Sequence, residues 1–224
     1  MHFKGKVPCT SFGAIIIFVD DLDREYLISF YEKSLGMFGD RPESLHWTSA
    51  GQIARYKALL DIAACIDGSK ILDFGCGKGD LCGFLKDRNI QISYTGLDIN
   101  EKLIEIGREK HPESVFGVFD IEKEDLEEDF DYIFLCGVFN LKVRGIEELI
   151  AYTLRKLFNH SRVGLAFNAL SAHEPRKDFE LHYVSPEEIF GFATKELSPF
   201  IAMRHDRIPY DFTMFVYRDG SFSP

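Results

Sequence analysis

Long apolar stretches are missing from this chain of 224 residues. The longest uninterrupted apolar run, Ala14–Val19, has six residues, whereas a membrane-spanning helix needs about 20. Asp20 and Asp21 follow that run, where a signal peptide would have small residues. We therefore expect a protein that neither enters a membrane nor is exported, and that acts in the cytoplasm.

Positive charge is scarce as well. The chain has 26 basic and 36 acidic residues, so its formal net charge is -10. A molecule with this charge repels polyanions as a whole. Nucleic acid is therefore not expected as a partner, and a small-molecule substrate is.

Paired cysteines are also absent. None of the five cysteines forms a Cys-x-x-Cys pair or stands at zinc-finger spacing from a histidine, which argues against a zinc site or a disulfide framework and favours a reducing compartment. No internal repeat is visible. With 46% hydrophobic residues, the chain can bury the core of one α/β domain with an appendage.

The most informative segment is Ile71–Leu81, which reads I-L-D-F-G-C-G-K-G-D-L. A short apolar run that contains Asp73 leads into three glycines at alternate positions, Gly75, Gly77 and Gly79. A strand that passes into a helix through glycines lets a ligand approach the backbone, because side chains there would block it. The segment therefore predicts a nucleotide-like ligand at the end of a strand.

Three kinds of nucleotide site compete for this loop. A P-loop needs a hydroxyl residue after its lysine, but Gly79 follows Lys78. A dinucleotide fingerprint has Asp80 at its third glycine position, close to where a pyrophosphate would lie. The third kind needs no phosphate, because it has a strand-end acid before the glycines and a second acid after the next strand. That pattern resembles motif I of the class I S-adenosylmethionine-dependent methyltransferases.

The following strands extend the resemblance over residues 48–218. Residues 92–97 read as a strand ending in Asp98, which suits ribose hydroxyls in this family and equally in dinucleotide enzymes. Residues 115–119 read as a third strand, and Asp120 stands where the family faces adenine. A fourth strand, residues 130–136, would lie beneath the methionine part of the cofactor. The resemblance implies that S-adenosylmethionine contacts residues of these strand ends, namely Asp73, Gly75, Cys76, Gly77, Asp98, Ile99, Asp120, Ile121 and Cys136.

The resemblance also implies a domain plan. Residues 1–47 would form an N-terminal cap segment, and residues 48–224 the S-adenosylmethionine-binding domain. Helical patterns cover residues 26–35, ended by Gly36, and residues 52–64. Tyr31 and Arg55, from these two helices, would reach the cofactor carboxylate, although a core aromatic and a surface charge are equally good interpretations.

The second half predicts the remaining elements. Apolar residues repeat at three and four over residues 146–158, as in an amphipathic helix, and residues 163–168 read as a strand. Ser185 opens a capping box, so a helix should begin there and run to about residue 197. Strands follow at residues 200–204 and 212–217. The family resemblance implies a Rossmann-like, doubly wound α/β fold of seven strands with an antiparallel last strand.

We expect any catalytic base to lie at the edge of the sheet where the parallel strands have their carboxyl ends, because ligands of such folds bind there. Methyl transfer is an in-line displacement that needs alignment and, for a hydroxyl, removal of a proton; it requires no metal. His205 is the first candidate, because Asp206 beside it could orient an imidazole, although both could simply form the turn before Pro209. His182, beside Tyr183, is the second.

These observations predict an S-adenosylmethionine-dependent methyltransferase that acts on a small molecule, with a sugar or secondary-metabolite hydroxyl ahead of an amine or carboxylate. No Asn-Pro-Pro-Tyr or Asp-Pro-Pro-Tyr motif is present, which makes a nucleobase amine a weaker candidate. An NAD-dependent oxidoreductase would share the glycine loop and Asp98 but leaves Asp120 unexplained. A non-catalytic S-adenosylmethionine-binding protein would keep the cofactor residues and lack a base.

Overall fold

The computed structural model of the chain describes residues 18–220. The part of the predicted cap segment that precedes residue 18 therefore lies outside the described residues. In the described part no helix is long and apolar enough to cross a membrane.

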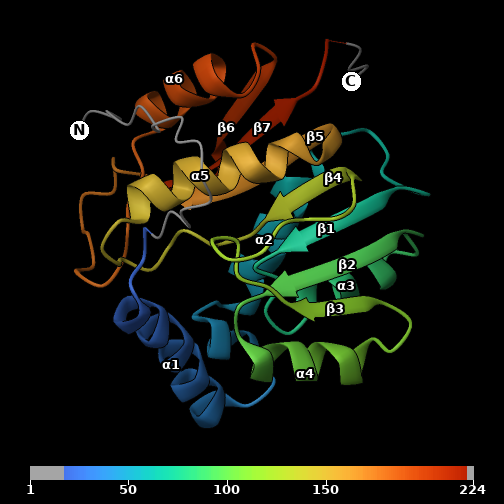
Figure 1. Cartoon of the computed structure of the whole chain (residues 1–224), viewed down its shortest axis with the longest axis vertical. Coiled ribbons are helices and arrows are strands. Elements are labelled where there is room, and N and C mark those ends of the chain that lie inside the picture. The colour runs from blue at the N-terminus through green and yellow to red at the C-terminus, as the bar shows by residue number, and fades with distance from the viewer. Residues whose placement is uncertain (1–17, 221–224) are drawn as a thin grey trace.

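A seven-stranded sheet forms the centre of the molecule, in the order β3-β2-β1-β4-β5-β7-β6 (Figure 1). The strands are β1 Lys70–Phe74, β2 Ser93–Asp98, β3 Val115–Val118, β4 Phe130–Leu135, β5 Ser161–Leu170, β6 Ile201–Ile208 and β7 Asp211–Tyr217. Neighbours from β3 to β5 pair in parallel, whereas β7 runs antiparallel to both β5 and β6. The predicted sheet with its antiparallel last strand is confirmed.

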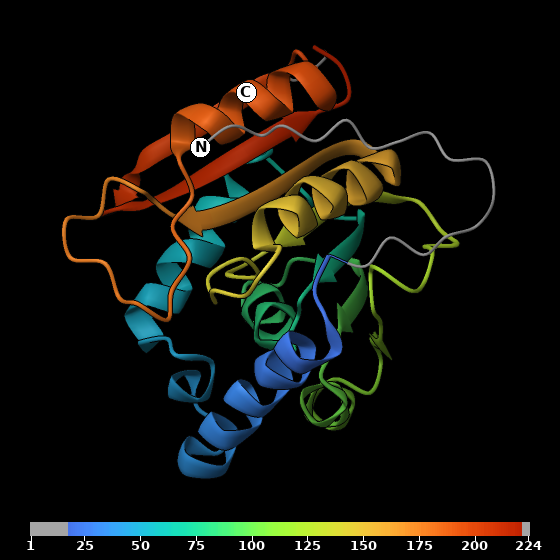
Figure 2. The ribbon, with the colours of Figure 1, turned by 60° about the vertical axis from the view of Figure 1, so that its left-hand side comes forward.

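Helices cover both faces of this sheet (Figures 1 and 2). They are α1 Asp21–Phe38, the short 3-10 helix η1 Pro42–Leu45, α2 Ser49–Leu60, α3 Asp80–Lys86, α4 Glu101–Lys110, α5 Ile146–Asn159 and α6 Pro186–Glu196. One apolar cluster buries the inner faces of α5 and α6, and a second buries those of α2, α3 and α4. Because helices lie on both faces, the fold is doubly wound.

The chain order explains where a ligand can bind. The chain builds β1, β2 and β3 outward from the centre and then returns to place β4 on the other side of β1. The two halves of the sheet diverge at this switch point, which leaves a crevice beyond the carboxyl ends of β1 and β4. In Figure 1 the arrows of β1, β2 and β4 point toward the side on which α1 lies.

Several predicted element ends are corrected by the structure. Helix α1 continues through Gly36, which costs only about 1 kcal/mol in a helix, and ends at Gly39 with φ 63°. Helix α2 starts earlier than predicted because Thr48 accepts a hydrogen bond from the Gly51 amide, and it ends at Leu60 rather than residue 64. The capping box of α6 is confirmed, since the Ser185 hydroxyl accepts from the Glu188 amide.

The predicted cap segment is tied to the rest of the fold by buried charges. Lys78 of the glycine loop is only 1% exposed, and its ammonium group donates to the Arg41 carbonyl at 3.0 Å. The same ammonium group lies 2.8 Å from the Asp40 carboxylate. The division at residues 47 and 48 stays a prediction, and these contacts show that the described part of the cap packs directly on the glycine loop.

Candidate functional site

The glycine loop joins β1 to α3 with a backbone that side chains would disturb. Gly75 has φ 71° and Gly79 has φ 73°, in the left-handed region that favours glycine. A Cβ atom on Gly75 would lie 2.6 Å from Val138 Cγ2, and one on Gly79 would lie 2.7 Å from Phe116 Cζ. The amide of Gly75 also donates to the Leu97 carbonyl at 2.7 Å, which holds the loop against β2.

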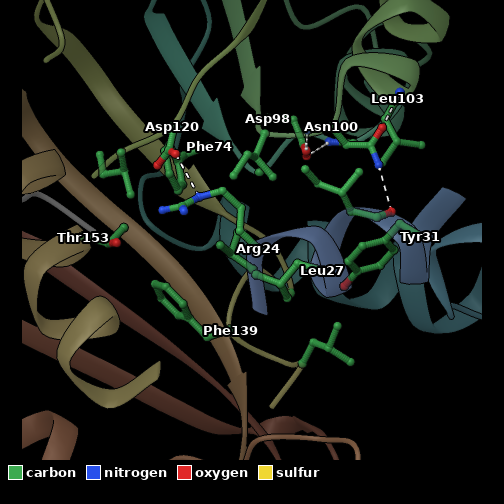
Figure 3. A pocket seen from close by; sticks show the side chains of 18 of the residues that line it. Arg24, Leu27, Tyr31, Phe74, Asp98, Asn100, Leu103, Asp120, Phe139 and Thr153 are labelled. Atoms are coloured by element: carbon green, nitrogen blue, oxygen red, sulfur yellow. Dashed lines mark hydrogen bonds and ion pairs between the residues drawn. The ribbon is translucent and has the colours of Figure 1, made fainter. Parts of the chain in front are cut away.

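Asp98 ends β2, as predicted, and its carboxylate faces the glycine loop. One carboxylate oxygen accepts from the Gly77 amide at 2.8 Å and the other from the Asn100 amide at 2.9 Å. Burial raises the pKa of this carboxyl, and the hydrogen bonds from Asn100 and Gly77 oppose the rise. The carboxylate lines a cavity at this edge of the sheet (Figure 3).

Asp73 lies elsewhere than the resemblance implied. Its carboxylate is 2% exposed, accepts a hydrogen bond of 2.6 Å from the Tyr94 hydroxyl and does not line that cavity. Burial raises its pKa to about 7; the Tyr94 hydrogen bond opposes the rise, and the nearby Asp98 and Asp80 charges add to it. Asp73 thus joins β1 to β2 through Tyr94 and is not part of the cavity wall.

Asp120 reaches the cavity, but with a partner that the sequence did not reveal (Figure 3). Arg24 of α1 is 7% exposed; its Nε lies 3.0 Å from Asp120 Oδ2, and its Nη2 lies 2.7 Å from Glu122 Oε2. The Glu122 amide donates to Asp120 Oδ1 at 3.1 Å. The carboxylate expected to face adenine is therefore already held by α1.

This first cavity has a volume of about 170 Å³ and follows the carboxyl ends of β3, β2, β1 and β4. Apolar residues such as Leu27, Phe74 and Leu103 form much of its wall, and α1 contributes one side of it. It is lined by eight of the residues predicted to bind the cofactor: Tyr31, Gly75, Gly77, Asp98, Ile99, Asp120, Ile121 and Cys136. Burial raises the pKa of Tyr31 to about 12, with a further contribution from Asp98, so its hydroxyl stays protonated.

Three predicted cofactor residues do not line the first cavity: Asp73, Cys76 and Arg55. Cys76 is buried behind the loop, where burial raises the pKa of its thiol well above the usual range. Its side chain fills the space that a Cβ on Gly96 would enter, at 2.8 Å from Sγ. Cys76 is thus a packing residue.

Arg55 lies in the wall of a second cavity, with a volume of about 460 Å³. Its Nε is 2.9 Å from Asp211 Oδ2, and its guanidinium group lies 4.2 Å from the centre of the Trp47 ring. The predicted carboxylate-binding arginine is therefore already paired with a buried carboxylate of β7.

The two cavities meet at Gly137. Five residues line both of them: Tyr31, Leu45, Trp47, Gly137 and Leu141. Gly137 has φ 74°, and a Cβ atom there would lie 2.3 Å from the Trp47 ring. Its amide donates to Asn168 Oδ1 at 2.8 Å, and Asn168 in turn donates to Asp211. A ligand at the end of β4 in the first cavity therefore adjoins the second cavity.

The two predicted histidines line neither cavity. Successive side chains of a strand point to opposite faces, so Asp206 does not pair with His205 but with Arg204, at 2.7 Å. His205 is exposed and packs beside Phe212. The prediction that Asp206 orients the His205 imidazole is therefore wrong. Burial, with help from Lys142, lowers the pKa of His182 to about 4.

Sequence reasoning missed Arg24 and Glu122, and it also missed His46 and Glu180 in the wall of the second cavity. Glu122 stands in an acidic stretch of the sequence, but it is only 7% exposed. Arg24 and Glu122 stand 98 positions apart in the chain, and no local pattern relates them.

Known proteins share this sequence pattern and this fold. A family model described as a methyltransferase domain matches residues 72–161. The chain is 28% identical over 161 residues to a Mycobacterium tuberculosis protein named "Putative methyltransferase Rv1506c", and the match covers 69% of this chain and 96% of that protein.

Solved structures have the same fold at low sequence identity. Magnesium protoporphyrin IX methyltransferase from Synechocystis, with bound S-adenosylhomocysteine, superposes with a TM-score of 0.64 at 15% identity, over 88% of this chain and 99% of that chain. An S-adenosylmethionine-dependent methyltransferase from Mesorhizobium loti gives 0.56 at 16% identity, over 74% and 98%. Residues 72–161 thus match a methyltransferase domain, and the chain has the Rossmann-like fold of solved S-adenosylmethionine-dependent methyltransferases.

Proposed function

We propose that this protein transfers a methyl group from S-adenosylmethionine to a small molecule that binds in the second cavity. The observation that carries the proposal is the junction of the two cavities at Gly137. One cavity has the glycine loop and the Asp98 carboxylate, and the other is larger and has aromatic walls. A donor in the first and an acceptor in the second would meet at their shared wall.

The residues of the first cavity suit the cofactor. Asp98 can accept hydrogen bonds from both ribose hydroxyls, and Gly75 and Gly77 bring the loop backbone to the cavity wall beside it. Apolar side chains near the end of β3, including Phe119 and Ile121, suit the flat adenine ring. The ends of β1 and β4, at Gly75 and Cys136, would hold the methionine part, which brings its sulfur toward Gly137.

When bound, S-adenosylmethionine supplies a methyl group already activated by its sulfonium charge. The chain then has to align the acceptor and exclude water. Side chains of α1 and η1 form one side of both cavities, including Tyr31 and Leu45. The pKa of Tyr31 is about 12. Its hydroxyl is therefore protonated at neutral pH and acts as a hydrogen-bond donor rather than as a base.

The acceptor is proposed to be a small molecule, with a hydroxyl or an amine as the methylated group. A sugar or secondary-metabolite hydroxyl was the first expectation from the sequence. Nucleic acid is not proposed, because the net charge is -10. Cys65, Cys76, Cys82 and Cys136 are free thiols, which supports the proposed location in a reducing compartment such as the cytoplasm.

A dinucleotide is the alternative ligand, and the structure offers less to it. Asp80 begins α3, where a dinucleotide pyrophosphate would lie. The nearest cations are already engaged by carboxylates, since Lys110 lies 2.7 Å from Asp80 and Lys78 lies 2.8 Å from Asp40. An NAD-dependent oxidoreductase therefore remains the less favoured function, and so does a protein that binds S-adenosylmethionine without catalysis.

Calorimetry with the full chain tests the proposal. We expect S-adenosylhomocysteine to bind at micromolar strength and NAD to give no measurable heat. Tight NAD binding without a response to S-adenosylhomocysteine would overturn the assignment. If S-adenosylhomocysteine binds but no hydroxyl or amine acceptor is ever methylated, the non-catalytic alternative is correct.

A further inference from the structure

The second cavity has aromatic walls and an acidic rim. Phe30, Tyr31 and Trp47 lie on its wall, and His46 stacks on Phe30 with 4.4 Å between ring centres and 23° between planes. Leucine side chains complete its apolar part, from Leu45, Leu141, Leu170 and Leu181. A planar, apolar body of about the size of one or two rings would suit this space.

Among the described residues, the unpaired charges that line this cavity are negative. Arg55 is the only lysine or arginine among its lining residues, and the Asp211 carboxylate neutralises it at 2.9 Å. Asp178 and Glu180, from the loop after β5, also line the cavity. These two carboxylates repel an anionic ligand and attract a cation, and aromatic walls stabilise a cation further.

The cavity is also rich in hydrogen-bond acceptors. Asn140 lies on its wall, and its side-chain oxygen is buried without a donor among the described residues. A buried acceptor without a partner is costly. Rotation about the soft terminal torsion of asparagine would bring this oxygen to a ligand. Together with Asp178 and Glu180 it forms an acceptor set that suits the N–H donors of an ammonium group.

His46 lines the same cavity as these groups. It adopts φ 59° at the end of η1, next to Trp47, which lines both cavities. Burial lowers the pKa of His46 and the Glu180 carboxylate opposes that shift. The imidazole is therefore neutral at neutral pH and can accept a proton, while Glu180 can stabilise the imidazolium that forms.

We propose that the second cavity binds an aryl-alkyl amine in its ammonium form and that His46, backed by Glu180, accepts its proton. This inference rests on the proposed function. The ammonium N–H bond breaks and its proton moves to His46, which leaves the lone pair on nitrogen. That lone pair forms the new N–C bond with the methyl group, while the S–C bond breaks and its electrons stay on the sulfur as S-adenosylhomocysteine is produced.

The first test compares three probes of one shape and different charge: 2-phenylethylamine, 2-phenylethanol and 3-phenylpropionate. Each is titrated into the full chain saturated with S-adenosylhomocysteine, and binding is followed by calorimetry and ligand-observed NMR. We expect the amine to bind about tenfold more tightly than the alcohol and the acid to bind least. Equal binding of amine and alcohol, preference for the acid, or no binding of the amine would overturn the amine class.

Variants separate the charge effect from other causes. Glu180→Gln should weaken amine binding about tenfold and leave alcohol binding unchanged, whereas Glu127→Gln, an exposed acid of the loop before β4, should change neither. If Glu180→Gln weakened both probes equally, the loss would be structural and the charge argument would be wrong.

A third experiment tests His46 as the base. His46→Gln should bind the amine within about threefold of the unchanged protein, yet lower methyl transfer to it by about 10²–10⁴-fold. His160→Gln is the matched control, because His160 lies at the end of α5 and pairs with Asp129. Normal transfer by His46→Gln would overturn the assignment. Failure to bind S-adenosylhomocysteine at all would instead refute the proposed function.

Discussion

At the scale of single residues, Asp98 has the largest proposed role in holding the cofactor. Its two oxygens accept from the Gly77 and Asn100 amides, which positions the carboxylate without using all of its lone pairs. It therefore both shapes the glycine loop and presents acceptors to the first cavity.

Replacement of Asp98 tests this role. Asp98→Ala should weaken binding of S-adenosylhomocysteine by roughly 1.5–3 kcal/mol, the usual range for hydrogen bonds to a charged group. Calorimetry measures the change, and circular dichroism checks the fold. Asp125→Ala is the control, because that side chain is 92% exposed. Unchanged affinity in Asp98→Ala would show that the ribose is held elsewhere.

Asp73 makes stability depend on pH. Its folded pKa of about 7 is above the ordinary aspartate value of 3.8, so between these values the folded state binds more protons than the unfolded state. Stability therefore falls as pH rises through that window, by at most about 4 kcal/mol.

Asp73→Asn should flatten this dependence, because an amide does not titrate and can still accept the hydrogen bond from Tyr94. Urea unfolding at pH values from 5 to 8 measures it. We expect the free energy of unfolding to fall less steeply in Asp73→Asn than in the unchanged protein. Asp87→Asn, at an exposed position, is the control. An equal slope in both Asp73→Asn and the unchanged protein would contradict the pKa assigned to Asp73.

At the scale of elements, α1 decides whether the first cavity is closed on one side. Arg24 anchors this helix to the segment after β3 through Asp120 and Glu122. Glu122 also accepts hydrogen bonds from the backbone amides of Phe18 and Val19, just before α1. The start of the helix and the predicted adenine end of the cavity are therefore one connected unit.

Arg24→Met removes the cation and leaves the buried Glu122 carboxylate, and the partly buried Asp120 carboxylate, without it. Breaking a buried pair in this way costs about 3–5 kcal/mol, so urea unfolding should show a loss of that order, together with weaker binding of S-adenosylhomocysteine. Arg144→Met is the matched control: Arg144 pairs with Asp20 and Asp23 but is 70% exposed, so solvent screens these pairs and the loss of stability should be far smaller. Similar losses in both variants would refute the anchoring role.

The sequence predicted which segments form helices and which form strands, but not where each of them ends. The capping box of α6 is a local signal, because the hydroxyl and the amide that it joins are three residues apart. Strand β6 extends to Ile208, four residues beyond its predicted end, because pairing with β7 holds it there. Pairing partners lie far along the chain, so a local pattern does not contain them.

At the scale of the whole molecule, cofactor binding should stabilise the fold. The first cavity joins α1 to the ends of four strands, and a ligand that binds there binds the folded state alone. At a concentration of about 100 times Kd such a ligand adds about 2.7 kcal/mol, which for a chain of this length raises Tm by roughly 5–11 °C.

A thermal scan with S-adenosylhomocysteine measures this shift, and NAD at the same concentration is the control. The shift should grow with the logarithm of the S-adenosylhomocysteine concentration and be absent with NAD. A comparable shift with NAD would favour the dinucleotide alternative.

The sequence by itself determined the fold and eight of the residues that line the first cavity. Glycines with left-handed backbone and acids at strand ends follow short-range rules, and Gly75, Gly77, Asp98 and Asp120 lie where those rules put them. Each of these features depends on a residue and its near neighbours in the chain.

Only the tertiary structure decided which charges pair and which histidine faces a cavity. Arg55 pairs with Asp211, 156 positions away, and Arg24 pairs with Glu122. His205 and Asp206 are adjacent in sequence but point to opposite faces of β6, whereas His46 and Glu180 are far apart in sequence and line one cavity. Electrostatic and hydrogen-bonding partners are set by distance in space, and the chain reaches that distance only after the sheet and α1 have packed together.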